Sequence, residues 1–110
     1  MKITASDFKL IIRAMGGSPV SENPEIYAVW TRGCRDPARY LFAFIPDFSG
    51  NEGETFKNVK LKFSHDVHVI VTEKTVIVNS KAYNIESADE PDLDVVRLFM
   101  ELIRRHKNLK

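Results

Sequence analysis

The hydrophobic residues of this chain change their spacing twice, and this change constrains the fold more than any other feature. They recur every three or four residues near the amino terminus, alternate with period two from about residue 26 to residue 85, and return to helical spacing from Leu93. The pattern contains no strand–helix–strand unit. We therefore expect an α+β fold of order α-β-β-β-β-β-β-α, in which an antiparallel sheet of about six strands packs against an N-terminal and a C-terminal helix.

The first helix is marked at both of its ends. Thr4 and Asp7 have the spacing of a capping box, with Asp in place of the usual Glu or Gln. The sequence Gly-Gly-Ser-Pro at 16–19 then ends the helical spacing. The helix is predicted at about residues 5–15.

Six segments show the composition and alternation of strands. They cover about residues 25–31, 39–45, 57–63, 67–72, 75–79 and 82–85. The first two form a hairpin, and the second is hydrophobic on both faces, which is typical of a central strand. The same order of elements also suits a barrel closed by the C-terminal helix, similar in arrangement to pleckstrin-homology folds, so the strand order stays open.

The C-terminal helix is hydrophobic around more than half of its circumference. An acidic segment with Pro91 precedes it, as is typical of a helix start. Its hydrophobic residues are Leu93, Val95, Val96, Leu98, Phe99, Met100, Leu102 and Ile103. Since so broad an arc needs cover on more than one side, we expect this helix to belong to the core. Its second side would suit a homodimer.

Length and composition favour one soluble domain over residues 1–110. The 110 residues are 44% hydrophobic and 28% charged, which is close to the average of globular proteins. Cys34 is the only cysteine, so no intrachain disulfide can form. No hydrophobic run approaches the roughly 18 residues that a membrane span needs. We expect a cytoplasmic protein without a membrane partner.

Three residues raise the question of catalysis or metal binding. Cys34 lies between arginines, but the phosphatase pattern needs an arginine six residues after the cysteine, where this chain has Tyr40. His65 and His68 form a single pair, whereas a structural zinc site usually has two pairs of ligands. The sequence therefore predicts no enzyme activity, no cofactor and no metal site.

The turn of the first hairpin is the main candidate for recognition. It holds three arginines within eight residues, a side chain type that binds carboxylates and phosphates in bidentate fashion. Two aromatic residues, one near this turn and one beside a polar loop, are further contact candidates. The predicted partner-binding residues are Arg32, Arg35, Arg39, Phe48 and Trp30.

These features predict a small non-catalytic binding protein, a standalone regulator or inhibitor that occupies a surface of a protein partner. Nucleic-acid binding is the alternative. The residues predicted for it are Arg32, Arg35, Arg39, Lys60 and Lys62. The net charge is only +1, so any attraction to phosphate would come from such local patches.

Overall fold

The computed structural model describes residues 3–22, 25–30, 41–49, 51–62, 67–87, 89–91 and 93–109. Its elements are α1 (Ala5–Ala14), β1 (Ser18–Glu22), β2 (Glu25–Trp30), β3 (Leu41–Pro46), β4 (Asn58–Lys62), β5 (Val69–Thr72), β6 (Thr75–Val78), β7 (Lys81–Asn84) and α2 (Asp94–Leu109). An antiparallel sheet with one helix at each end of the chain confirms the predicted fold class.

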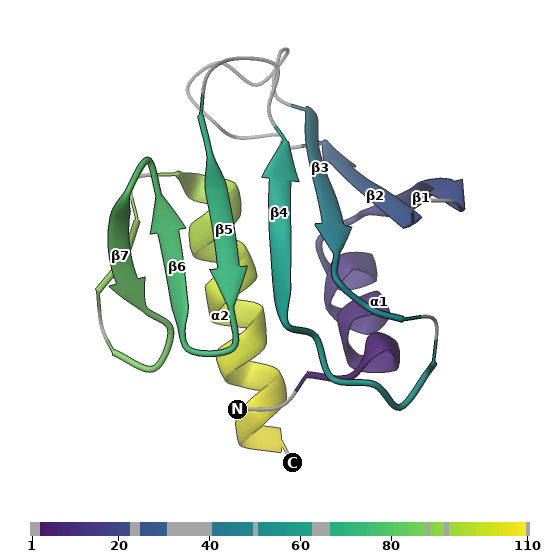
Figure 1. Ribbon diagram of the computed structural model, residues 1–110. Coiled ribbons are helices and arrows are strands. Elements are labelled where there is room, and N and C mark those ends of the chain that lie inside the picture. Colours follow the sequence, from purple (N-terminus) through teal and green to yellow (C-terminus); the bar gives the residue numbers. More distant parts are fainter. Residues whose placement is uncertain are drawn as a thin grey trace.

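The seven strands follow one another in the sheet in the same order as in the sequence (Figure 1). Every neighbouring pair is antiparallel, and β1 and β7 are the two edges. The sheet is therefore open over the described residues, which answers the question of sheet or barrel. Both helices lie behind the sheet in the view of Figure 1, and the face toward the viewer carries no helix.

The sheet has one strand more than the sequence predicted, because β1 lacks the pattern of a half-buried strand. Four of its five residues are exposed. It pairs with β2 through a register shift between Pro19 and Ser21. Proline and a bulge are common at sheet edges, where they hinder pairing with another chain. Such an edge strand gives no alternating hydrophobic signal.

The predicted capping box starts α1. The Asp7 backbone N–H donates to the Thr4 hydroxyl at 3.2 Å, and the Thr4 backbone N–H donates to the Asp7 carboxylate at 3.1 Å. At the other end Gly16 has φ +81°, a conformation that favours glycine. Gly17 then passes so close to Ile12 that a Cβ on it would lie 2.4 Å from the Ile12 Cγ2 atom.

The long polar loop between β3 and β4 completes the amino end of α1. The Ala5 backbone N–H donates to the Glu54 carbonyl at 3.0 Å, which satisfies an amide that has no partner within the helix. The Glu52 carboxylate accepts from the Ser6 hydroxyl at 2.7 Å and pairs with Lys9 at 3.0 Å. The hydrogen bond from Ser6, followed by the one from Lys9, holds the pKa of Glu52 below its ordinary value.

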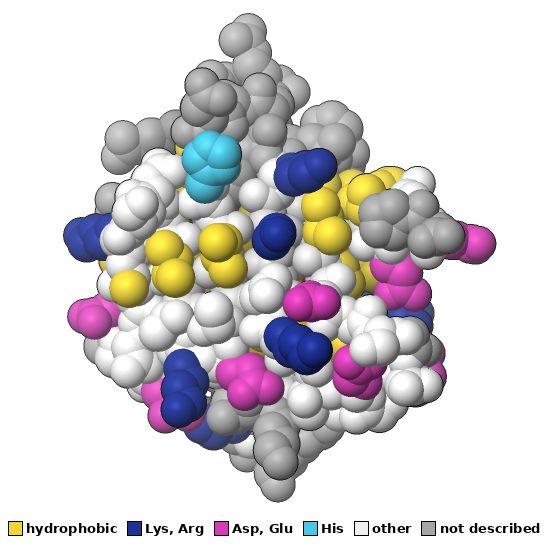
Figure 2. All heavy atoms as spheres, in the orientation of Figure 1, with side chains coloured by type: hydrophobic (Ala, Val, Ile, Leu, Met, Phe, Trp, Pro, Cys, Tyr) yellow, Lys and Arg dark blue, Asp and Glu magenta, His cyan; other side chains and the backbone are white. Residues whose placement is uncertain are grey.

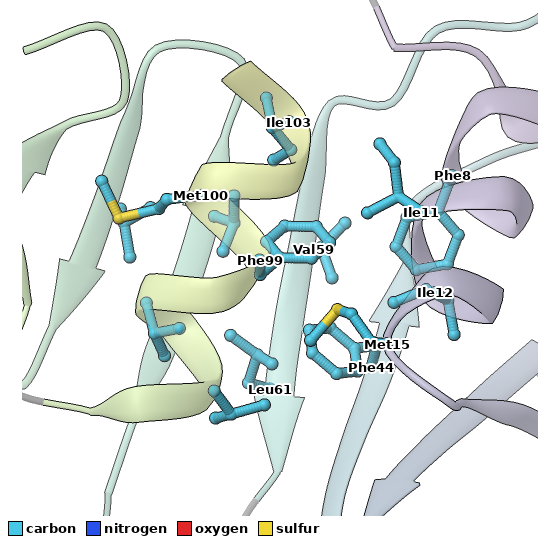
Figure 3. Packing of buried hydrophobic residues seen from close by; sticks show 14 of the residues in the cluster. Phe8, Ile11, Ile12, Met15, Phe44, Val59, Leu61, Phe99, Met100 and Ile103 are labelled. Atoms are coloured by element: carbon cyan, nitrogen blue, oxygen red, sulfur yellow. The ribbon is translucent and has the colours of Figure 1, made fainter. Parts of the chain in front are cut away.

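A cluster of aromatic rings joins both helices to the sheet (Figure 3). The ring of Phe99 on α2 lies 5.1 Å from Phe44 on β3 and 6.3 Å from Phe8 on α1. Phe8 also makes edge contacts with Tyr27 at 5.5 Å and with Phe48 at 5.9 Å. These rings fix the positions of α1 and α2 relative to each other.

Helix α2 belongs to the core, as the sequence predicts, but only along one side. The residues that face the sheet and α1 are at most 1% exposed: Val95, Val96, Phe99, Met100 and Ile103. Leu98 lies on the other flank of the hydrophobic arc and is 40% exposed. The second side of the arc is thus left uncovered by the described residues.

One buried contact between a carboxylate and a histidine also connects the two helices. Asp7, whose side chain is 8% exposed, is the one buried polar or charged residue in the described ranges. Its Oδ1 atom lies 2.9 Å from Nε2 of His106 in the last turns of α2. The distance suits an ion pair when the histidine is protonated, and Nε2 has no hydrogen-bond partner among the described residues. A carboxylate at a helix start and a histidine near a helix end are each also favoured by the helix dipole.

Candidate interaction surface

The helix-free face of the sheet carries a row of hydrophobic side chains that crosses five strands. From β3 to β7, the residues that lie directly opposite one another are Ile45, Lys60, Ile70, Ile77 and Ala82. We call these five residues the outer row. Figure 2 shows the row from the front, where hydrophobic side chains form a band interrupted by a basic side chain.

Strand geometry explains why this row faces away from the helices. Successive side chains of a strand point to opposite faces of the sheet. Of the residues that alternate with the outer row on β4, β5 and β6, Val78 is partly buried and the others are buried: Val59, Leu61, Val69, Val71 and Val76. Ile70 of the outer row is 39% exposed, while Ile45 and Ile77 are partly exposed.

Two exposed lysines lie on this face, in or beside the outer row. Lys60 lies within the outer row, and Lys62, two residues later on β4, lies opposite Ala43. Both are exposed, and neither forms an ion pair with any residue that the structure describes. Their charges are therefore available to a binding partner.

A polar row borders the outer row on the side of the β5–β6 turn. Asn58 lies opposite Thr72, and Thr75 lies opposite Asn84. The hydroxyls of Thr72 and Thr75 lie 2.9 Å apart and share a hydrogen bond. Beyond them is an open hollow of about 350 Å³ lined by Lys57, Thr72, Glu73 and Lys74. The hydrophobic surface is thus limited to a band with polar side chains beside it.

The other residues predicted to bind a partner do not join this surface in the described structure. Phe48 is partly buried and contacts Phe8, so its ring belongs to the edge of the core. Trp30 is the last residue of β2, but its side chain lies outside the description. The arginines of the first hairpin turn also fall outside the described residues: Arg32, Arg35 and Arg39.

Cys34 and His65 likewise lie outside the described residues. His68 is exposed, and its backbone N–H donates to the Asn79 side chain at 2.9 Å. Within the described ranges, no three His, Cys, Asp or Glu side chains come together in a way that could hold a metal ion. No helix over the same ranges is long and hydrophobic enough to cross a membrane.

The titratable groups with altered pKa values lie outside the outer row. Burial raises the pKa of Tyr27. Hydrogen bonds from Ser49 lower the pKa of Glu54, and a hydrogen bond from Lys107 lowers that of Glu86. The shifts of Glu54 and Glu86 come from hydrogen bonds that hold a loop or a helix in place. What the outer row offers to a ligand is hydrophobic area and positive charge.

The sequence indicated the lysines of this surface but not its isoleucines. Ile70 and Ile77 lie in segments where both faces are largely hydrophobic, such as Val-Ile-Val, so alternation alone does not say which face is covered.

Comparisons with protein-family models, with curated protein sequences and with solved structures find no match to this chain.

Proposed function

We propose that this chain is a small non-catalytic binding protein that regulates or inhibits a protein partner by covering part of its surface. The observation that carries the proposal is the outer row, a band of hydrophobic side chains on a sheet face that no described helix covers. A partner that covers this band removes hydrophobic surface from water. For Ile70, which is 39% exposed, complete burial would contribute about 1 kcal/mol.

The position of Lys60 specifies the chemistry of the partner. Lys60 stands inside the hydrophobic band and has no ion pair with a described residue, so burial without a counter-charge would be costly. A second copy bound through this same face would bring lysines against lysines. The partner should therefore present a hydrophobic patch with carboxylates that meet Lys60 and Lys62.

A crosslinking experiment identifies such a partner, and variants of the outer row then test the binding site. A photoreactive amino acid at position 77 should crosslink to the partner in cell extract, and the partner is then purified. We expect Ile70→Asp and Lys60→Glu each to weaken its binding at least about 10-fold, because one removes hydrophobic contact and the other reverses a facing charge. Arg13→Glu is the matched control, since it makes the same charge change at an exposed position of α1.

Binding of the purified partner that is unchanged in both Ile70→Asp and Lys60→Glu would contradict the proposal. So would a partner whose binding surface has no acidic residue. Reversing the facing carboxylate of the partner to lysine should restore binding of Lys60→Glu, and this exchange identifies the contact directly.

Nucleic-acid binding is the second candidate, and the two exposed lysines on one face favour it. Ile45 and Ile70, on either side of Lys60, favour a protein instead, because phosphate groups gain nothing from hydrophobic contact. A mobility shift at about 50 mM salt that is lost in Lys60→Ala/Lys62→Ala would support nucleic acid. We expect no such shift.

A further inference from the structure

The helical side of the molecule carries a second hydrophobic surface, far from the outer row. A groove of about 230 Å³ runs between α1 and α2, lined by Leu10, Ile11, Ala14, Leu102, Arg105 and His106. Leu10 is 54% exposed, and Leu98 on α2 is also exposed, which places both among the four most exposed large hydrophobic residues of the described structure. Leu98 and Leu102 are four residues apart, so they lie on the same side of α2.

The charges along the exposed side of α2 are divided between its two ends. Asp94, in the first turn, has a side chain that is 54% exposed, and Arg105, near the end, has one that is 67% exposed. Their separation of 11 residues corresponds to about three helical turns, so the two side chains lie on one stripe with Leu98 between them. The stripe is thus acidic at its start and basic at its end, and between these ends lie Leu98 and the exposed Glu101.

Each of the two charges also has a partner on its own helix. Asp94 lies 3.7 Å from Arg97, and Arg105 lies 2.6 Å from Glu101. Exposed pairs of this kind contribute little to stability, so a contact with another molecule can replace them at small cost.

The stripe on one copy of α2 is complementary to the same stripe on a second copy when the two helices run antiparallel. When two copies of α2 run antiparallel about a twofold axis near residue 100, Leu98 of one copy lies over Leu102 of the other. The same arrangement brings Asp94 of each copy to Arg105 of the other, as an isologous interface requires. A parallel arrangement would bring like charges together instead.

We propose that a second copy of this chain docks on α2 to form a twofold homodimer. The core of the interface is Leu98 and Leu102, with Leu10 of α1 at its border. The two ion pairs between Asp94 and Arg105 fix its antiparallel direction. Because the contact is one helix stripe rather than a broad face, we expect a dissociation constant in the micromolar range.

The homodimer would have a consequence for partner binding, although it does not depend on that function. Both helices lie behind the sheet, so a dimer through α2 leaves the outer row of each copy open (Figure 1). The dimer would then present two partner-binding faces and bind clustered or dimeric partners with increased avidity.

Two charge-reversal variants test this interface, because each should dimerise poorly alone and the two should form a heterodimer when mixed. In Asp94→Arg both ends of the stripe are basic, and in Arg105→Asp both are acidic. By sedimentation equilibrium, we expect each variant alone to have a dimer dissociation constant raised about 10-fold. A 1:1 mixture should form a heterodimer at least as tight as the wild-type dimer. In it the introduced arginine of one chain faces the introduced aspartate of the other, and the unaltered Arg105 faces the unaltered Asp94. Heterodimer formation also shows that both variants are folded.

Leu98→Lys should raise the dissociation constant at least about 10-fold, whereas Ile70→Lys, which makes the same kind of change on the outer row, should leave it unaltered. A wild-type chain that stays monomeric up to about 500 μM would overturn the proposal, since a micromolar dimer is then almost fully formed. A dimer that is insensitive to Leu98→Lys, or a mixture of the two charge variants that does not associate, would overturn it as well.

Discussion

Replacement of Phe99 by alanine tests the packing that joins α2 to the rest of the fold. The ring is 1% exposed and contacts aromatic rings from two other elements, Phe44 on β3 and Phe8 on α1. Removal of a fully buried phenylalanine side chain costs about 3–5 kcal/mol, which includes the cavity left behind. A domain of this kind has a total stability of about 5–15 kcal/mol, so the variant should be barely stable.

Urea unfolding followed by circular dichroism in dilute protein measures this loss, and Leu98→Ala is the matched control on the preceding residue. Since Leu98 is partly exposed, its replacement should cost less than about 1.5 kcal/mol. If Phe99→Ala does not fold at all, Phe99→Leu should still fold with a loss of about 1–2 kcal/mol. A loss for Phe99→Ala no larger than that for Leu98→Ala would refute the assignment of Phe99 to the centre of the core.

Three further predictions concern the surroundings of α1. Gly17→Ala should destabilise the fold by about 1–3 kcal/mol, because its Cβ would lie 2.4 Å from Ile12, whereas Gly53→Ala, which meets open space, should be nearly neutral in the same unfolding assay. Asp7→Ala should cost about 1–3 kcal/mol in thermal or urea unfolding, since it removes the carboxylate that accepts from the Thr4 backbone N–H and that contacts His106, while the Thr4 hydroxyl keeps its hydrogen bond from the backbone of residue 7; a loss below about 0.5 kcal/mol would contradict both roles. Because the pKa of Glu52 is lowered in the folded state, its stabilising effect should be present above the ordinary value of 4.5 and disappear as pH falls through the folded value; the difference in unfolding midpoint between wild type and Glu52→Gln should therefore vanish in acid.

The helices and most strands could be predicted because their local signals agree with their packing. Thr4 and Asp7 form the capping box that their spacing indicated, and α2 has a buried side that matches its hydrophobic spacing. β1 could not be predicted, because an exposed edge strand with a proline has no alternating pattern. The role of the loop before Phe56 was also hidden, since the contacts of Glu52 and Glu54 with α1 join residues more than 40 positions apart.

The candidate surface was only partly visible in the sequence for a related reason. Lys60 and Lys62 were recognised because they alternate with buried residues on a single strand. The outer row arises from register, which places Ile70 beside Ile77 and Lys60 across separate strands. A sequence pattern describes one strand at a time, so it does not show which side chains become neighbours across a sheet. Hydrophobic residues on both faces of β5 left open which face the helices cover.

An NMR titration of the 110-residue chain with the crosslinked and purified partner tests the central claim most directly. Amide signals of the outer row on β4, β5 and β6 should shift or broaden on addition of the partner, while those of α1 and α2 stay unchanged apart from small uniform effects. The same titration with Lys60→Glu should show no saturation over the concentration range that saturates wild type. Signal changes confined to the helices, with the amides of Lys60, Ile70 and Ile77 unaffected, would contradict the account.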